Sequence, residues 1–209
     1  MKEFPFFKCI EGAQALIVGG GKVALRKARA LTPFGVRLRV VAPVLDAGMA
    51  ELGAICERRA FIPEDLDGAQ LVVAATDDRA VNAQVARLCR ERGIEVNVAD
   101  DPEAGTFHFP AMLNRGTLTV AVSTGGASPI AAGYLMERIQ TAVPEQIEAV
   151  LDCMESARRR VKERISDPAV RRAALVRAFA RCMEDGPLPD AAEMETLLFA
   201  DDCGGRQAP

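Results

Sequence analysis

The chain has 209 residues, of which 49% are hydrophobic and 26% are charged, and its formal net charge is −3. This composition is ordinary for a globular protein and lacks a basic excess, so we expect no nucleic-acid partner. No apolar stretch approaches the ~20 residues that span a bilayer, so we expect no membrane partner either. The N-terminus has no apolar run of signal-peptide length, and none of the six cysteines belongs to a C-x-x-C pair. We therefore expect reduced thiols and a cytoplasmic protein.

Strands and helices are predicted to alternate through the first hundred residues. Short apolar runs that end at glycine or proline predict buried strands, and apolar residues at helical spacing predict helices. The predicted strands cover residues 14–18, 36–42, 71–75 and 94–98, and the predicted helices cover 22–31 and 79–92, with a shorter helix near 49–52. This alternation predicts an α/β fold, in which a Rossmann-type parallel sheet is covered by helices.

The pattern changes after Asp100. One more strand is predicted at residues 118–123, followed by a loop and a helix over 130–142, and only helical patterns follow Pro144. We therefore expect three segments, covering residues 1–113, 114–144 and 145–209. The middle segment is too small to bury its own apolar residues, so we expect it to pack against a second copy of the chain in a homodimer.

The turn after the first strand fits a dinucleotide-binding motif. Gly19-x-Gly21-x-x-Ala24 matches the G-x-G-x-x-G/A fingerprint, and it follows a strand and opens a helix. Gly19 permits the tight turn, Gly21 lets the backbone approach a pyrophosphate, and Ala24 keeps helix and strand close. The helix N-terminus then offers free N–H groups to the phosphates. The alternative is a tight glycine turn that binds no ligand.

The end of the second strand favours NAD over NADP. The acidic residue that usually binds the ribose is missing from Val41–Val44, and Asp46 is the nearest carboxylate. No arginine directly follows the strand to hold a 2′-phosphate. Polar residues also follow three other predicted strands, at 75–78, 97–100 and 123–126. Ligands bind outside the carboxyl ends of parallel strands, so we expect these segments to converge beside the glycine turn.

Together these stretches resemble the precorrin-2 dehydrogenase family, the N-terminal module of siroheme synthase. The matching stretches, which keep the order and spacing of the family from residue 4 to about residue 140, are FPFF (4–7), LIVGGGKVALRKA (16–28), VVAP (40–43), AATDD (74–78) with Val81–Asn82, VNVAD (96–100), FHFPA (107–111) and VSTGGASP (122–129). The C-terminal part matches only loosely, as a helical tail.

The resemblance implies NAD-dependent oxidation of precorrin-2 to sirohydrochlorin by an intertwined homodimer, with metal insertion in some members. It makes residues 1–113 an NAD-binding domain, 114–144 a dimerisation segment and 145–209 a helical C-terminal domain. It assigns the catalytic role to Asp100. The expected cofactor contacts, including two residues at the end of the third strand, are Gly19, Gly21, Lys22, Val23, Pro43, Val44, Thr76 and Asp77.

Two residues near the expected cleft have more than one interpretation. Asp100 follows a strand, so its carboxylate can take a proton or hold a metal, but it can also form an Asx turn before Pro102. Asp101 is the neighbour most easily mistaken for it. His108 is the only histidine. It is a possible metal ligand or proton shuttle, and the alternative is a packed side chain between two phenylalanines.

Cationic residues and a glycine-rich loop are the candidate contacts for the carboxylates of the substrate. The loop either binds a carboxylate through amides at a helix start or simply caps the helix. The candidates in and near it are Arg115, Ser123, Thr124, Gly125, Gly126 and Ser128. A basic run over residues 158–164 is more typical of a solvated helix face than of a binding site.

Two other functions compete with the dehydrogenase. An NAD-sensing regulatory Rossmann module without chemistry explains the glycine turn but not the VSTGGASP segment or the helical tail. A chelatase with vestigial NAD binding conflicts with the intact Gly19 and Gly21. The sequence holds no cluster of metal ligands that decides whether a metal is inserted.

Overall fold

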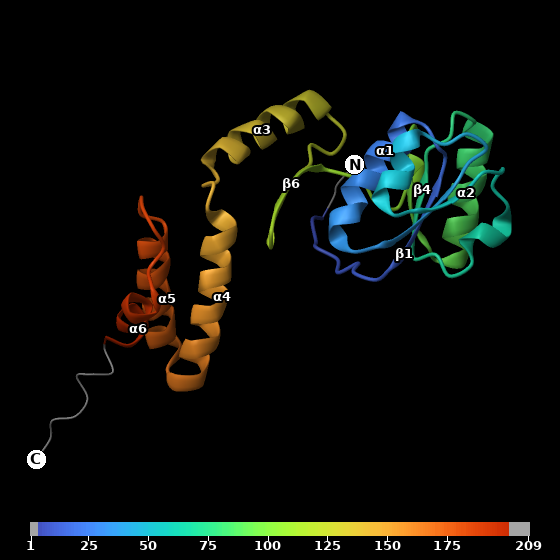
Figure 1. Cartoon of the computed structure of the whole chain (residues 1–209). Helices are drawn as coiled ribbons and strands as arrows, with labels where there is room; N and C mark the ends of the chain where they lie inside the picture. The colour runs from blue at the N-terminus through green and yellow to red at the C-terminus, as the bar shows by residue number, and fades with distance from the viewer. Residues whose placement is uncertain (1–3, 201–209) are drawn as a thin grey trace, which may run out of the picture. The chain divides into compact units, whose positions relative to one another are not determined.

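The computed structural model describes residues 4–200 and divides into two compact units (Figure 1). The first comprises the described residues up to Pro110 together with Gly125–Ala127, and we call it the sheet unit. The second comprises Ala111–Thr124 and the described residues from Ser128 on, and we call it the helical unit. Each unit is described by itself.

Five parallel strands form the sheet unit, in the order β3-β2-β1-β4-β5. The strands are β1 (Gln14–Val18), β2 (Arg37–Val41), β3 (Ile55–Glu57), β4 (Leu71–Ala74) and β5 (Glu95–Val98). The helices are α1 (Lys22–Leu31) and α2 (Arg79–Arg92). Four 3-10 helices lie in the connections: η1 (Thr32–Phe34), η2 (Ala47–Leu52), η3 (Pro63–Leu66) and η4 (Pro102–Ala104). The predicted Rossmann-type α/β fold is confirmed.

The central strand is buried on both faces, which explains its continuous apolar sequence. Ala15 and Ile17 belong to the apolar cluster that contains the buried face of α1. Leu16 and Val18 point to the other face and join the cluster that contains Val85 and other buried residues of α2. The two helices therefore cover opposite faces of the sheet, as in doubly wound folds.

Sequence reasoning missed two strands and misjudged one helix. β3 has only three residues, and the short helix expected near 49–52 is instead the 3-10 helix η2. The other missed strand, β6 (Ala111–Arg115), pairs with β7 (Leu118–Val122) in an antiparallel hairpin. Arg115 pairs with Leu118 across a two-residue turn, where Gly116 has a φ of 56°. Glycine adopts that left-handed conformation without strain.

A network of ion pairs holds β3 and the segment after it to the sheet. Asp65 is 2% exposed, and its carboxylate lies 2.5 and 2.7 Å from the Arg59 guanidinium. It also pairs with Arg39 of β2 and accepts a hydrogen bond from the Ile62 N–H at 2.9 Å. The hydrogen bond from Arg59 is the main reason that the pKa of Asp65 is lowered. A buried carboxylate is stable only with such partners.

The helical unit contains the β6–β7 hairpin and four helices, and its core lies among the last three. The helices are α3 (Pro129–Ala142), α4 (Ile147–Arg164), α5 (Pro168–Cys182) and α6 (Ala191–Phe199). Val150 and Val161 of α4, Ala174 of α5 and Leu198 of α6 are almost fully buried in one cluster. The predicted helical pattern beyond Pro144 is confirmed up to residue 200, and the last nine residues lie outside the described part.

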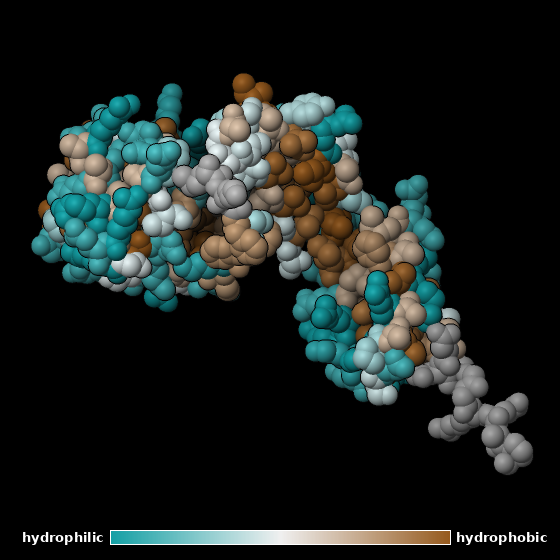
Figure 2. All heavy atoms as spheres, turned by 180° about the vertical axis from the view of Figure 1, so that it is seen from behind, coloured by the Kyte–Doolittle hydropathy of each residue, from teal (hydrophilic) through white to brown (hydrophobic). Residues whose placement is uncertain are grey.

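The helical unit also exposes apolar side chains, and Figure 2 shows them as a brown area on one face of it. On α3, Ile130 is 86% exposed and Tyr134 is 61% exposed. The two strands of the hairpin are both edge strands, since their sheet has no third member. Within residues 4–200, none of the helices is long and apolar enough to cross a membrane.

Candidate functional site

The glycine turn lies where the strand order reverses. β1 connects to β2 on one side, whereas its other neighbour, β4, connects to β5. In open parallel sheets this switch point, at the carboxyl ends of the strands, is the usual ligand crevice. The residues after β1, β2, β4 and β5 therefore define the candidate site.

Backbone contacts at two glycines bring three loops together. Gly19 has a φ of +129°, and a Cβ there would lie 2.3 Å from the Ala75 carbonyl oxygen after β4. A Cβ on Gly20 would lie 1.9 Å from the Val44 carbonyl oxygen after β2. The Asp46 N–H also donates to the Gly20 carbonyl at 2.7 Å. Only glycine permits these approaches, so the turn is locked between the two neighbouring loops.

The next glycine opens onto free space at the start of a helix. Gly21 is the N-cap of α1, no side chain caps this helix, and its first turn holds no acidic residue. The first N–H groups of α1 are thus available to an anion. A Cβ on Gly21 would meet nothing within 4 Å. Ala24, one turn on, is fully buried against the sheet. These residues fit the pyrophosphate of a dinucleotide.

The other expected cofactor contacts surround this space and are open to solvent. Val23 is 42% exposed and Val44 is 80% exposed, and both are large apolar side chains. Lys22 and Pro43 are exposed as well. Asp46 is half-buried, and one of its carboxylate oxygens accepts a hydrogen bond from the Gly48 N–H at 3.0 Å, which caps η2. Its second oxygen is therefore the one that a ribose hydroxyl would use.

Asn82 joins the ends of β4 and β5 to the first turn of α2. It is 1% exposed. Its Oδ1 accepts hydrogen bonds from the Thr76 N–H at 3.0 Å and from the Thr76 hydroxyl at 2.8 Å. Its Nδ2 donates to the Thr76 carbonyl at 3.1 Å and to the Asp100 carboxylate at 3.0 Å. Since the amide of Asn82 is fully paired, it fixes Thr76 and Asp100 relative to each other.

The Asp100 carboxylate is hydrogen-bonded to Asn82 and is partly open to solvent. Its side chain is 35% exposed and lies 3.6 Å from Nε of Arg79. The Asx role that was the alternative for Asp100 falls on its neighbour, because Asp101 accepts a hydrogen bond from the Ala104 N–H at 3.2 Å and caps η4. Asp77, by contrast, is exposed, and its neighbour Asp78 caps α2.

The segment after η4 packs on the α1 side of the sheet. The rings of Phe107 and Phe109 lie 5.5 Å apart, and Nζ of Lys27 lies 4.1 Å from the centre of the Phe109 ring. The pKa of Lys27 is lowered to about 8, mainly by burial and to a smaller extent by the nearby positive charge of Arg26. His108 is half-buried between the two phenylalanines in the sequence. Within residues 4–200, no three His, Cys, Asp or Glu side chains lie close enough together to hold a metal ion.

The glycine-rich loop forms the start of α3. Ser128 is the N-cap, and its hydroxyl accepts a hydrogen bond from the Ala131 N–H at 3.1 Å. The Thr124 hydroxyl in turn donates to the Ser128 carbonyl, also at 3.1 Å. Gly125 and Gly126 have φ values of 60° and 82°. Ser128 and Thr124 therefore cap the start of α3, as in the capping interpretation. Gly125 and Gly126 form the turn between them, and Ser123 comes directly before Thr124.

Arg115 also has a local structural contact. Its Nη1 lies 3.5 Å from the carbonyl oxygens of Val143 and Pro144, just past the end of α3. Cations are favoured near the carbonyls at a helix C-terminus. The assignment of Arg115 as a substrate contact stays a prediction, and so does the assignment of the loop before α3.

Sequence reasoning missed two residues of this site. Gly20 occupies a variable position of the fingerprint, yet it makes the closest backbone approach in the turn. Asn82 belongs to a stretch that matches the family, but its partner Asp100 is 18 residues away. The one available signal was its polar amide at a helical position next to apolar Val81 and Val85.

Proteins named siroheme synthase are similar to this chain. It is 42% identical to the siroheme synthase of Azotobacter vinelandii over 176 aligned residues. The aligned region covers 82% of this chain and 38% of that protein. It is 40% identical to the siroheme synthase of Methylococcus capsulatus over 99% of this chain and 45% of that protein. The predicted resemblance is confirmed, and the chain spans less than half the length of these curated relatives.

The fold is shared with a solved structure and with a sequence family. The structure of "SirC, precorrin-2 dehydrogenase" matches with a TM-score of 0.70 and 23% identity, over 96% of this chain and 100% of that one. Residues 6–111, about half of the chain, match the family described as "Putative NAD(P)-binding". That range contains the glycine turn, the uncapped start of α1 and the Asn82 network. This chain belongs to that NAD(P)-binding family.

Proposed function

We propose that this chain is a dehydrogenase that oxidises precorrin-2 to sirohydrochlorin with NAD. The reaction removes a hydride and a proton from the reduced tetrapyrrole, giving sirohydrochlorin, NADH and H⁺. Two kinds of relative support the proposal, namely the siroheme synthases and the structurally similar precorrin-2 dehydrogenase. The observation that carries it is the position of Asp100, which a buried amide links to the loop beside the glycine turn.

The protein side of the mechanism follows from these contacts. NAD, when bound, supplies the hydride acceptor. The free N–H groups of α1 would hold its pyrophosphate, and the apolar Val23 and Val44 would cover its less polar parts. Asn82 keeps the Asp100 carboxylate at the end of β5, where this group takes the proton. A carboxylate with a fixed orientation suits that role: one oxygen is hydrogen-bonded to Asn82, the other lies near Arg79, and the side chain is still 35% exposed.

NAD is the proposed cofactor rather than NADP. A 2′-phosphate needs a cation after β2, and residues 42–48 contain none. They do contain Asp46, whose negative charge would repel a phosphate. We expect NAD to support turnover at concentrations at which NADP does not.

We also propose a homodimer that forms through the helical unit. A two-stranded hairpin is marginally stable alone, and both of its strands have free edges. The exposed Ile130 and Tyr134 are four residues apart on α3, so they share one face of that helix. A second copy of the chain would cover both features. Arg115, together with the amides of Gly125 and Gly126 in the loop before α3, remains a proposed contact for carboxylates of the substrate.

An anaerobic assay with purified protein, precorrin-2 and NAD tests the function. We expect NADH and sirohydrochlorin to appear together in a 1:1 ratio, and little product with NADP. A regulatory module would bind NAD and leave precorrin-2 unchanged. Parallel reactions in which sirohydrochlorin is mixed with Fe²⁺ or Co²⁺ show separately whether the chain also inserts a metal.

A further inference from the structure

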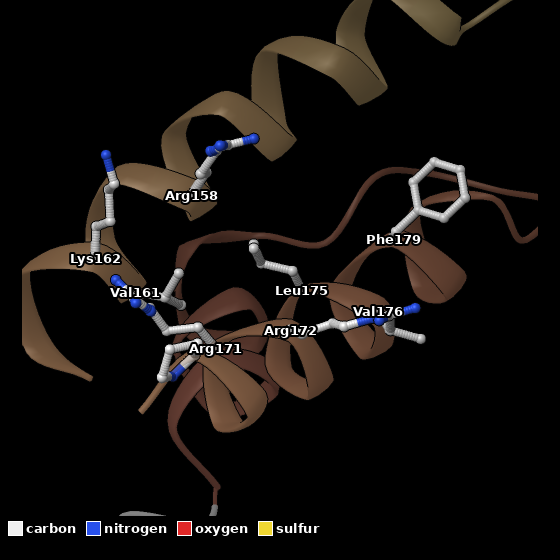
Figure 3. A pocket seen from close by; sticks show the side chains of 9 residues that line it. Arg158, Val161, Lys162, Arg171, Arg172, Leu175, Val176 and Phe179 are labelled. Atoms are coloured by element: carbon white, nitrogen blue, oxygen red, sulfur yellow. The ribbon is translucent and has the colours of Figure 1, made fainter. Parts of the chain in front are cut away.

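We propose that a groove between α4 and α5 binds the carboxylate-bearing edge of the tetrapyrrole, an inference that rests on the proposed function. The groove has a volume of about 510 Å³ and lies entirely within the helical unit (Figure 3). The side chains that Figure 3 labels along the groove come from both helices: Arg158, Val161, Lys162, Arg171, Arg172, Leu175, Val176 and Phe179.

The basic run of α4 is divided between two environments. Arg160 and Arg164 turn to α6, where both pair with Glu195, and Arg164 stacks 3.6 Å from the centre of the Phe199 ring. These two arginines stabilise the helical core, and they lower the pKa of Glu195. Arg158 and Lys162 instead line the groove. Sequence reasoning favoured a single solvated helix face for residues 158–164. The structure instead divides these cations between a packed side and the groove.

Four cationic side chains line the groove. Arg158 and Lys162 come from α4, and Arg171 and Arg172 come from α5. Within residues 4–200, none of these four side chains forms an ion pair with a carboxylate. Like charges on neighbouring positions repel one another, so a bound anion would relieve a cost that the free protein carries.

The floor of the groove is apolar and partly open to solvent. Val161 is buried at its base, while Phe179 is 44% exposed and Val176 is 58% exposed. A small inorganic anion gains nothing from such a floor. An amphiphile with a flat apolar body and several carboxylates gains from both the floor and the rim.

The proposed substrate has this chemistry. Precorrin-2 is a tetrapyrrole with eight carboxylates around an apolar macrocycle. Guanidinium groups bind carboxylates through two parallel hydrogen bonds, and three of the four rim cations are arginines. Phe179 offers a ring face on which a pyrrole can stack. The groove therefore matches one edge of the macrocycle together with the acidic side chains on that edge.

Binding of uroporphyrin, a stable tetrapyrrole with eight carboxylates, tests the inference on the full chain. We expect the double variant Arg158→Gln/Arg172→Gln to bind it at least about tenfold more weakly than the wild type, as measured by quenching of porphyrin fluorescence. Phe179→Ser should also weaken binding. Arg159→Gln is the matched control, because Arg159 lies on the same helix but pairs with Glu155 outside the groove. All four positions are exposed, so the variants should melt like the wild type.

The outcomes separate this inference from the proposed function. If the double variant binds uroporphyrin like the Arg159→Gln control, the groove is not a tetrapyrrole site, although precorrin-2 oxidation could still hold. If the wild type binds uroporphyrin through the groove but oxidises no precorrin-2, the proposed function is wrong and the groove is still a tetrapyrrole site. If the double variant changes the oligomeric state and leaves uroporphyrin binding intact, the groove serves a second copy of the chain and the inference is wrong.

Discussion

The candidate site depends on a single buried amide more than on any charged group. Asn82 makes four hydrogen bonds, and three of them go to Thr76. The fourth is the contact that fixes Asp100. A buried residue thus sets the geometry of the carboxylate that is proposed to take the proton, which makes Asn82 a positioning residue.

Removal of this amide should affect stability and turnover together. Asn82→Ala leaves the Thr76 N–H without its partner, which costs about 1–3 kcal/mol in the free energy of unfolding. We expect precorrin-2 turnover to fall as well, because Asp100 loses its anchor. Gln84→Ala, at an exposed position of the same helix, is the control and should stay within ~0.5 kcal/mol of the wild type. Urea unfolding and steady-state rates measure both effects, and an Asn82→Ala protein with wild-type turnover would show that Asp100 needs no anchor.

Asp100 and Asp101 offer a comparison between neighbouring carboxylates. Asp100→Asn keeps the size of the side chain but removes its basicity, so turnover should fall by roughly 10²–10⁴-fold if it is the general base. Asp101→Asn should be nearly silent, because asparagine caps a helix about as well as aspartate does. NAD affinity should change little in either variant. Equal, wild-type rates of precorrin-2 oxidation in both would mean that positioning of NAD alone carries the reaction.

At the scale of elements, the sequence predicted most of the sheet unit and failed where local patterns are weak. The predicted strands and both long helices agree with the structure to within one residue at each end. β3 was invisible because two of its three residues are exposed, which leaves no apolar alternation to detect. β6 was missed because its half-buried residues show no clear alternation.

The candidate site was predictable only in part, for a similar reason. The fingerprint located the glycine turn because its residues are adjacent in sequence. The close approach of Gly20 to Val44 and the bond between Asn82 and Asp100 join residues 24 and 18 positions apart. Such contacts follow from the order and register of the strands, which a single sequence does not reveal.

The ion pairs around Asp65 should decide how the β3 edge responds to substitution and to acid. Asp65→Asn removes the buried carboxylate that pairs with Arg59 and Arg39 and leaves Glu57 as the acidic partner of both, so we expect a loss of about 1.5–3 kcal/mol in the free energy of unfolding. The pKa of Asp65 is lowered in the folded state. Its stabilisation is therefore complete above the ordinary value of 3.8 and is lost as the pH falls through the lower, folded-state value.

Urea unfolding at a series of pH values measures both effects. The difference in stability between wild type and Asp65→Asn should be constant near neutral pH and should shrink in acid below pH 3.8. Asp67→Asn is a suitable control, since Asp67 is 74% exposed and pairs with Arg92 at the surface. A difference that does not depend on pH would contradict the charged state proposed for Asp65.

At the scale of the whole molecule, the exposed apolar face of α3 predicts a dimer. Light scattering at micromolar concentration should give twice the mass of one chain. Tyr134→Glu places a charge on that face and should shift the protein toward monomer, whereas Gln140→Glu, at an exposed polar position of the same helix, should not. A wild-type protein that is monomeric under these conditions would rule out the proposed interface.

The central claim is that a dinucleotide binds at the glycine turn and that the chemistry follows from it. Calorimetric titration of NAD into the wild type and into Gly21→Asp tests this most directly. Gly21 has ordinary extended backbone angles and free space around it, so the variant should fold and melt like the wild type. Its carboxylate would face the pyrophosphate, and we expect NAD affinity to fall by at least about 100-fold. Unchanged NAD affinity in Gly21→Asp would contradict the account.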